Sequence, residues 1–377
     1  MPKPVPRLHQ GLLRGLVASG HMPPDDDPQA LQRALRQSVD AAIAAFLACQ
    51  RERMCDLAPA SAALVDMIEL IIGGGGKRLR PMLCYLAYRA GGRPDGPEIL
   101  RAAASLELLH TFAILHDDVM DQAVLRRGHP ALHRRLADER RAAGHPNDAD
   151  AYGVSVAVLA GDLALVLSDA MMAGSGFDKE TLARGLVPLE EMRVQAVAGQ
   201  YVDILEAGGP STAPEEAARI ARLKTAGYSV VGPVAVGTAL ADPPPAVAEA
   251  LARYARAVGE AFFLRDEVLG LFADAEETGK DAESDLRRGK PTTLIADAIA
   301  RSPVARRQVI EGLWGNPEAT AADLGIIREI VEASGALGDA TSAVRRLVDE
   351  AVESLAAASL MDDAPGRLLA ALAGRLR

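Results

Sequence analysis

The chain has 377 residues, 49% of them hydrophobic and 24% charged, which is typical of a soluble globular protein with a sizeable core. Its net charge of −10 argues against a general nucleic-acid-binding protein, although local basic clusters occur within that acidic total. Aromatic residues make up only 3%, and Ala, Leu, Arg and Glu are abundant, so the composition favours an all-α fold.

The cysteines and the first residues bear on where the protein works. Cys49, Cys55 and Cys84 are odd in number and lack metal-binding spacing, so neither a disulfide framework nor a zinc site is indicated. We therefore expect a reducing, cytoplasmic environment. Arg14 interrupts the apolar residues near the N-terminus and no convincing cleavage site follows it, so we expect no signal peptide.

The first predicted element is a long helix over residues 29–56, preceded by the Pro- and Asp-rich stretch HMPPDDDP at residues 21–28. We expect residues 1–28 to form a disordered extension and residues 29–377 to form one helical domain. Apolar residues then recur at three- and four-residue spacing almost everywhere, interrupted by short glycine- and proline-rich stretches. There is no fixed-period repeat and no run of alternating strand residues, so the pattern predicts a single bundle of ten or more helices.

Four glycines precede a basic cluster in IIGGGGKRLRP, which places Lys77, Arg78 and Arg80 at the start of the next helical pattern. Glycine lets the backbone approach an anion closely, and the N-terminus of a helix attracts one. The stretch is not a nucleotide-binding P-loop, because Arg78 follows the lysine where that motif requires Ser or Thr. It predicts an anion site, and the alternative is a solvated basic turn.

The stretch LHDDVMDQAVLRRG, residues 115–128, places acidic and basic residues together at the end of an apolar helix. Asp117 and Asp121 lie four residues apart and therefore on one helix face, where their charges repel unless a cation relieves them. Mg²⁺ commonly binds one or two protein carboxylates and takes its other ligands from water and substrate phosphates. Arg126 and Arg127 follow, and arginine suits phosphate oxygens. The pattern indicates metal-bridged phosphate binding, and the alternative is a solvated acidic helix end.

The most apolar segment is VSVAVLAGDLALVLSDAMMAG, residues 154–174, which is long enough to suggest a membrane span. Asp162 and Asp169 would then lie at bilayer depth at considerable cost. We therefore expect a core helix and no transmembrane segment, with Asp162 making a structural polar contact inside the bundle.

A second acidic pair, Asp266 and Glu267, lies in the apolar stretch FFLRDEVLGLFAD at residues 262–274. Lys280 and Lys290 follow it. The sequence thus predicts a second acidic surface with basic residues beyond it.

Taken in order, GGKRLRP, DDVMD with RRG, GQYVD, KTAGY, the second acidic pair and TGK with SDLRRGK resemble the motifs of the trans-isoprenyl diphosphate synthase family. The resemblance runs from about residue 70 to residue 293, and within the family the chain looks most like the actinobacterial geranylgeranyl diphosphate synthases. It implies an all-α fold whose helices surround a deep apolar cavity, with two aspartate-rich walls across its mouth. The implied reaction is Mg²⁺-dependent condensation of isopentenyl diphosphate with an allylic diphosphate to a longer all-trans prenyl diphosphate.

The resemblance also implies a role for each motif residue. Three Mg²⁺ ions would be held by Asp117, Asp121 and Asp266, with Asp118 and Glu267 in the outer shell. Contacts to the allylic diphosphate fall on Arg126, Lys224 and Lys280, and contacts to isopentenyl diphosphate fall on Lys77, Arg80, His110 and Arg127. Lys290 would lie in a closing loop, Lys224, Thr225 and Gly227 at a helix break that exposes carbonyls to the carbocation, and Gln200 and Asp203 nearby. The departing diphosphate is the expected proton acceptor.

Three positions of the second acidic motif depart from the family pattern. Phe263 stands where the family has Gln, Glu267 where it has the middle Asp, and Gly270 where it has the last Asp. We expect metal binding to persist through Asp266 with weaker support around it. Phe263 removes an amide near the reacting centre and could reshape the pocket.

Product length in this family is set by bulk below the first aspartates. Phe112 and Ala113 precede Asp117 by five and four residues, roughly 6 to 8 Å deeper along the helix. One aromatic beside a small residue resembles the geranylgeranyl-forming pattern, so we expect a geranylgeranyl product, with farnesyl next and a longer prenyl diphosphate as a further alternative. The alternative is that Phe112 is an ordinary core aromatic. His116 is expected to be a core or supporting histidine rather than a metal ligand.

Other functions remain open from the sequence. A terpene cyclase would share the ionisation chemistry, but it would not need the isopentenyl diphosphate site at Lys77, Arg80 and Arg127. A weakly active regulatory subunit of a partner synthase is supported only by the altered second acidic motif. Members of the family usually pair, so a homodimer is expected. The preferred allylic primer, the pathway served and the role of residues 1–28 are not determined by the sequence.

Overall fold

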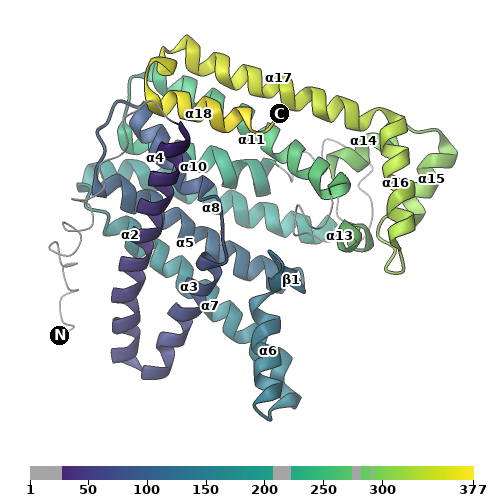
Figure 1. Cartoon of the computed structure of the whole chain (residues 1–377), viewed down its shortest axis with the longest axis horizontal. Helices are drawn as coiled ribbons and strands as arrows, with labels where there is room; N and C mark the ends of the chain where they lie inside the picture. Colours follow the sequence, from purple (N-terminus) through teal and green to yellow (C-terminus); the bar gives the residue numbers. More distant parts are fainter. Residues whose placement is uncertain (1–27, 207–221, 274–281, 290–291) are drawn as a thin grey trace.

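The computed structural model describes residues 28–206, 222–273, 282–289 and 292–377. The predicted disordered extension, residues 1–28, lies outside the described residues except for Pro28, which begins the first helix. Nearly all described residues are helical (Figure 1), so the prediction of an all-α fold is confirmed. The long helix predicted over residues 29–56 is present as α2, Pro28–Leu57.

The helices follow one another with short connections. In the N-terminal half they are α3 (Ala62–Gly73), α4 (Leu79–Ala90), α5 (Pro97–Met120), α6 (Leu132–Ala142), α7 (Ala149–Ala173) and α8 (Lys179–Glu206). In the C-terminal half they are the π-helix η3 (Arg222–Val231), α10 (Gly232–Ala241), α11 (Pro245–Phe272), α13 (Ala282–Arg288), α14 (Thr293–Arg301), α15 (Val304–Leu313), α16 (Ala321–Ser334), α17 (Ala336–Ala357) and α18 (Ala364–Gly374). Single 3₁₀ turns cover Pro59–Ser61, Pro146–Asp148 and Leu360–Asp362.

Helix α5 lies at the centre of the molecule. All eight residues from Ala102 to Leu109 are buried, so this helix meets other elements on every side, as an apolar helix in a protein interior should. It packs against α7, α4 and α2. Because α5 ends with the acidic motif, the central helix carries that motif from the core to one edge of the bundle.

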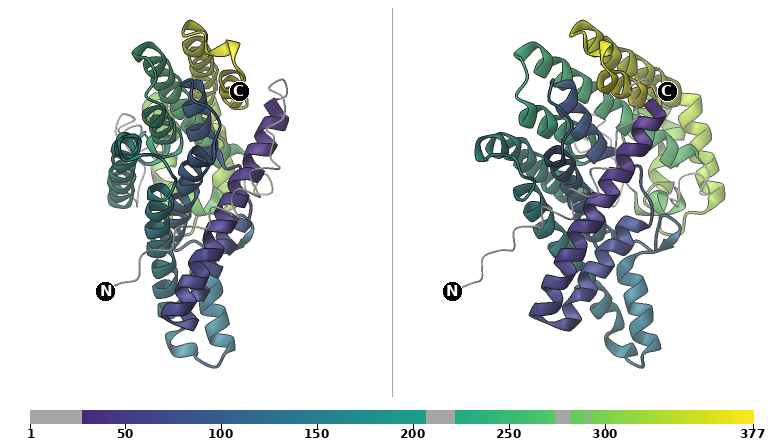
Figure 2. Two further views of the ribbon diagram at one scale, coloured as in Figure 1. Left: turned by 90° about the vertical axis from the view of Figure 1, so that its left-hand side faces the viewer. Right: turned by 60° about the vertical axis from the view of Figure 1, so that its left-hand side comes forward.

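The remaining helices surround α5 and extend the bundle. Helix α11 packs along α17, while α14, α15 and α16 form a second apolar cluster around Leu294, Ile310 and Ile327. In Figure 1, α17 and α18 lie at one end of the molecule and α6 extends at the other. The views in Figure 2 show α2 running along the outside of the bundle.

Helix α7, which the sequence predicts to be a core helix, is buried on only one face. Leu167 and Met171 are buried, whereas Leu159, Val166 and Asp162 are exposed. Asp162 makes the expected polar contact, since its Oδ1 lies 3.5 Å from His116 Nε2 on α5, but its side chain is 58% exposed, so the prediction that it lies inside the bundle is wrong. By length and composition alone α5 and α7 could each cross a membrane, and α5 is mostly buried inside the fold.

Candidate active site

The first acidic motif lies in the last turn of α5. Asp117, Asp118 and the C-capping Asp121 occupy the end of the helix where the backbone carbonyls carry partial negative charge, so carboxylates there are unfavourable without cations. The helix stops because Gln122 adopts a left-handed conformation and Ala123 N–H donates to the carbonyl of Asp118 at 2.9 Å, a Schellman-type ending. Asp117 and Asp121 remain partly exposed, whereas Asp118 is buried.

Arg126 neutralises the start of this motif. Its Nη2 donates to Asp117 Oδ2 at 3.2 Å, and its Nε donates to Asp118 Oδ1 at 2.7 Å. Burial raises the pKa of Asp118, and the Arg126 hydrogen bond opposes that rise. Arg126 belongs to a two-strand hairpin, β1 (Leu125–Arg126) and β2 (His129–Pro130). Its two-residue turn, Arg127 and Gly128, has positive φ angles of 53° and 77°, the pattern of a type I′ hairpin.

The turn sends Arg127 away from the acidic motif and toward the glycine loop. Its Nη1 donates to the carbonyl of Gly75. Burial lowers the pKa of Arg127, while Glu107 opposes this and Arg78 adds to it. The two consecutive arginines therefore serve different groups, with Arg126 on the carboxylates and Arg127 beside the basic loop.

Arg80 and His110 form a second region next to Arg127, in which the arginines carry the positive charge. The Arg80 guanidinium lies 4.5 Å from the centre of the Tyr228 ring, and its Nη2 donates to Ser229 Oγ at 2.8 Å. The His110 ring lies 6.2 Å from the same Tyr228 ring. Burial, reinforced by Arg80 and Arg127, holds the pKa of His110 well below its usual value, so this imidazole is neutral.

Several buried nitrogen atoms of the motif residues have no hydrogen-bond partner. Arg80 Nε and His110 Nδ1 are buried and unpaired, and Gln200 Nε2 on α8 is in the same condition. Buried polar groups normally find a partner, so orphaned groups call for a ligand. The region around Arg80 and His110 therefore suits an anion.

The KTAGY motif lies on the π-helix η3, which runs directly into α10, so the backbone at this motif is a continuous helix of altered type rather than the predicted break. Lys224 and Thr225 are on η3, but their side chains lie outside the described residues. Tyr228 is buried and its hydroxyl donates to the carbonyl of Leu109 at 3.1 Å. Helix α8, which carries Gln200 and Asp203, packs against η3. The helices that carry the GQYVD and KTAGY motifs are therefore neighbours.

The second acidic motif is on α11. Asp266 is exposed. The carboxylate of Glu267 instead accepts hydrogen bonds from Thr293 N–H at 2.8 Å and Leu294 N–H at 3.2 Å, and it also accepts the Thr293 hydroxyl. Glu267 therefore caps the N-terminus of α14. Gly270 has no heavy atom within 4 Å of where a Cβ would lie, and nothing in the structure explains Phe263.

Arg288 on α13 bridges Asp121 of the first acidic motif and Asp285 on its own helix. Its Nη1 donates to the carbonyl of Asp121 at 3.0 Å and lies 3.4 Å from that residue's Oδ2, while its Nη2 lies 3.3 Å from Asp285 Oδ1. Lys280 and Lys290 lie outside the described residues. Within the described parts of the chain, no three His, Cys, Asp or Glu side chains converge closely enough to hold a metal between them.

Phe112 and Ala113 lie on the half-buried face of α5, one turn inside the acidic motif. The Phe112 ring meets the His116 ring edge to face at 4.7 Å. His116 Nε2 lies 3.1 Å from the carbonyl of Val158, and a Cβ at Gly161 would overlap the imidazole. His116 is therefore a packed histidine between α5 and α7, as the sequence predicts.

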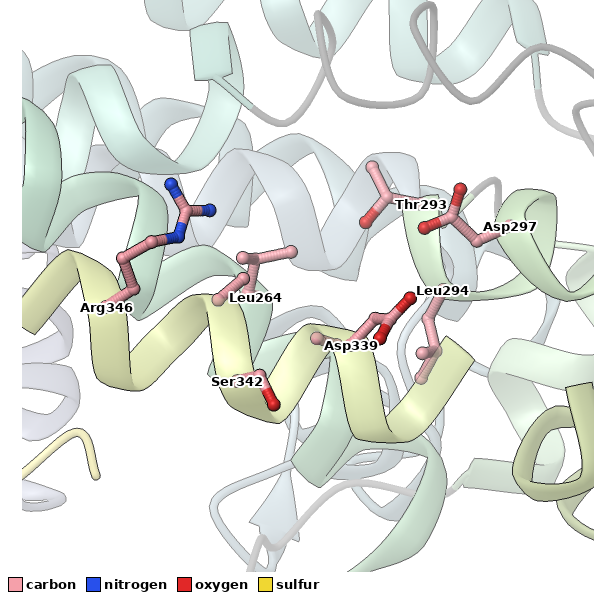
Figure 3. A pocket seen from close by; sticks show the side chains of 9 residues that line it. Leu264, Thr293, Leu294, Asp297, Asp339, Ser342 and Arg346 are labelled. Atoms are coloured by element: carbon pink, nitrogen blue, oxygen red, sulfur yellow. The ribbon is translucent and has the colours of Figure 1, made fainter. Parts of the chain in front are cut away.

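A cavity of about 480 Å³ lies between α11, α14 and α17. Leu264, Thr293 and Asp339 are among the residues that line it (Figure 3). Leu264 and Asp266 are two residues apart on α11, about 200° around the helix, so this cavity lies behind the second acidic motif. It is not the site formed by the motif residues.

Three residues near the site carry no role in the sequence prediction. Asp40 on α2 and Glu107 on α5 both bind the buried Arg78, and Arg288 binds Asp121. Glu107 has a visible signal, because it is a lone charge within a continuous run of buried positions on α5. Asp40 has none, because α2 is amphipathic and carries many charged residues.

The chain is similar to known proteins over most of its length. Residues 61–334 match the family model described as polyprenyl synthetase. A geranylfarnesyl diphosphate synthase of Aeropyrum pernix is 32% identical over 303 residues, 79% of this chain and 89% of that protein. A (2E,6E)-farnesyl diphosphate synthase of Mycobacterium tuberculosis is 30% identical over 290 residues, 76% of this chain and 75% of that protein.

The solved structures include a similar fold. The crystal structure of geranylgeranyl pyrophosphate synthase from Corynebacterium glutamicum, complexed with isoprenyl diphosphate and magnesium, superposes with a TM-score of 0.83. The two sequences are 31% identical, and the match covers 91% of this chain and 98% of that one.

Proposed function

Because the chain belongs to the polyprenyl synthetase family, we propose that it condenses isopentenyl diphosphate with an allylic diphosphate and that its product is geranylgeranyl diphosphate. Prenyltransferase activity follows from the family. The similar proteins differ in the product that their names give, so the product length and the roles of individual residues are our proposal.

One observation supports elongation above all. Two regions suited to diphosphate lie along α5: the acidic motif at its end, where Arg126 pairs with carboxylates that would hold metal, and the region of Arg80 and His110, where Arg80 Nε and His110 Nδ1 are buried without partners. Two diphosphates need two such regions. A terpene cyclase, which binds one diphosphate, has no use for the second, so the paired arrangement favours chain elongation.

The carboxylates fit Mg²⁺ by their chemistry. Mg²⁺ prefers oxygen ligands and takes only one or two protein carboxylates, so a cluster of three is not required. Asp117 and Asp121 would hold metal on one side and Asp266 on the other, with Asp118 supporting from behind and Glu267 acting through α14. Bound Mg²⁺ would supply positive charge to the leaving diphosphate. The similar Corynebacterium synthase was crystallised with magnesium and an isoprenyl diphosphate.

The basic residues and His110 would bind the two diphosphates. Arg126, together with Lys224 and Lys280, would hold the allylic diphosphate as charge builds on it during cleavage of the C–O bond. Arg80, Arg127 and Lys77 would hold isopentenyl diphosphate, with neutral His110 donating one hydrogen bond, so that its double bond faces the allylic carbon. Lys290, which precedes α14 in the sequence, would complete the site.

Gln200, Asp203 and Thr225 lie on α8 and η3 beside this region, where backbone and amide dipoles would stabilise the positively charged carbon chain. No side chain is placed as a general base. The departing diphosphate would accept the proton, because it is the strongest base beside the reacting carbon once the C–O bond has broken.

Mass spectrometry of the product tests this function. Purified protein with Mg²⁺, isopentenyl diphosphate and dimethylallyl, geranyl or farnesyl diphosphate in turn should give geranylgeranyl diphosphate. A cyclic hydrocarbon would indicate a cyclase instead. No product with any primer, with product restored by a partner synthase, would indicate a regulatory subunit.

We also propose a cytoplasmic homodimer that pairs through α7 and α8. Both helices present large apolar side chains to solvent, and Arg193 on α8 bonds Asp169 on α7, so the exposed faces are neighbours. The exposed apolar residues include Leu159, Val166, Val187, Val194, Val197 and Tyr201. Large apolar side chains exposed in this number on two helices are typical of a protein interface.

A further inference from the structure

Arg78 is a buried arginine that the proposed reaction does not use. Arg78 is 5% exposed, and its guanidinium forms hydrogen bonds to groups on three helices. Nε donates to Asp40 Oδ1 on α2 at 2.6 Å, Nη1 donates to Glu107 Oε1 on α5 at 3.0 Å, and Nη2 donates to the carbonyl of Ile72 on α3 at 2.9 Å. A lysine has no planar fork to make these three bonds at once.

The same residue sets the backbone between the glycine loop and α4. Arg78 is the N-cap of α4 and has a left-handed conformation, with φ 50° and ψ 39°. Its bond to Ile72 closes the loop of residues 73–77 by tying the end of α3 to the start of α4. Gly76 packs directly on the guanidinium, since a Cβ there would lie 2.8 Å from Nη1. The direction in which Lys77 and Arg80 leave the backbone thus depends on where Arg78 is held.

Glu107 gives the arrangement its charge balance. It is buried, it pairs with Arg78, and it lies one turn before His110 on α5. Its charge favours the protonated form of Arg127, which Arg78 and Arg80 oppose. Without such an acid, several guanidinium groups would be brought together in a poorly solvated region with only repulsion between them.

We propose that Arg78, Asp40 and Glu107 are positioning residues that hold Lys77 and Arg80 in place for the diphosphate of isopentenyl diphosphate. This proposal rests on the proposed function, and it deepens one of its two binding regions. Asp40 lies on α2, before residue 61, where the match to the family model begins. Helix α2 is therefore part of the support of the active site.

Asp40 is the residue best suited to a test. Its side chain is 40% exposed and lies at the edge of the bundle, so removing its carboxylate leaves no core cavity, unlike a change at buried Arg78. Arg36 provides a matched control, because it lies one turn earlier on α2 and its Nε is 3.8 Å from Asp40 Oδ2, with both side chains open to solvent. Exposed pairs of this kind contribute little.

Steady-state kinetics with both substrates separate positioning from general damage. We expect Asp40→Ala to raise KM for isopentenyl diphosphate about tenfold while KM for the allylic diphosphate stays near the wild-type value. The KM of Asp40→Asn for isopentenyl diphosphate should lie between those of the wild type and Asp40→Ala, since the amide oxygen still accepts from Arg78 but carries no charge. Arg36→Ala should match the wild type. Equal changes in both KM values, or a fall in kcat alone, would overturn the proposal.

Binding of inorganic diphosphate without divalent metal gives a second readout that does not depend on turnover. Calorimetry should show about tenfold weaker binding to Asp40→Ala than to wild type or Arg36→Ala. If the wild type makes no prenyl product, the proposed function fails, yet this comparison still decides the role of Asp40. Equal affinities in all three proteins would contradict the positioning role.

Discussion

His110 is a neutral side chain among arginines, and this has an energetic cost at acid pH. Burial and the nearby guanidinium groups hold its pKa well below the usual 6.5, so the folded protein does not take up a proton there, whereas the unfolded chain does. A depressed histidine pKa therefore removes stability as pH falls through about 6.5, at up to about 1.4 kcal/mol per pH unit.

Replacing His110 should flatten this dependence. In urea unfolding between pH 7.5 and pH 5, His110→Gln should lose less free energy of unfolding on acidification than the wild type, because the titrating group is gone. His129→Gln is a suitable control, since that histidine is exposed. Parallel curves for wild type and His110→Gln would contradict a buried neutral imidazole.

Phe112 tests the proposed product length. Phe112→Ala should lengthen the product by at least one five-carbon unit, because the growing prenyl chain could then occupy the space of the half-buried Phe112 ring on α5. Phe177→Ala is the matched control: that ring is also half-buried and packs on an aromatic partner, Tyr88, at 5.7 Å. An unchanged product length in Phe112→Ala, measured by mass spectrometry, would remove Phe112 from this role.

Arg78 and Arg80 differ in a way that the sequence does not predict. IIGGGGKRLRP predicts an anion site, and Arg80 has the orphaned donor that such a site needs. Arg78, two residues earlier, belongs to the same basic cluster in the sequence but turns inward to Asp40 and Glu107. The left-handed backbone at residue 78 makes this difference, and no composition or spacing rule predicts it.

At the scale of the element, α14 depends on a residue of α11. The Glu267 carboxylate accepts hydrogen bonds from the first two N–H groups of α14. Thr292 Oγ1 accepts one from the third, Ile295 N–H, at 3.2 Å. A helix N-terminus leaves four such donors unsatisfied. The glutamate that replaces the family's aspartate therefore has a structural use.

Removing that cap should loosen α14. We expect Glu267→Ala to lower the free energy of unfolding by about 1 to 2 kcal/mol and to speed hydrogen exchange over residues 293–301. Glu260→Ala, which changes an exposed carboxylate about two turns earlier on α11, should do neither. Equal exchange in the two variants would show that the cap does not stabilise α14.

Element boundaries were predictable where composition marks them. The Pro- and Asp-rich stretch correctly places the start of α2, and the acidic motif correctly lies at the end of α5. The half-exposed state of α7 was not predictable, because an apolar helix in a core and an apolar helix at an interface have the same composition. The choice between them depends on which neighbours cover it.

At the scale of the whole molecule, that exposed face leads to a prediction about assembly. Light scattering should give the mass of a dimer for the wild type and of a monomer for Val194→Glu, because a charge would then replace one of the exposed apolar side chains through which α8 is proposed to pair. Val304→Glu alters a similarly exposed valine on α15 and should remain dimeric. A monomeric wild type would contradict the proposed pairing.

Arg288 and Arg126 have a further consequence for the protein before it meets any divalent ion. Three aspartates share the negative end of α5, yet two guanidinium groups from later in the chain already lie against them. A chelator such as EDTA should therefore abolish the prenyltransferase activity without lowering the melting temperature. Small domains that fold only around their metal behave differently, because a chelator unfolds them. The two arginines act as counterions for the aspartates, so the fold does not need a divalent ion to balance their charge.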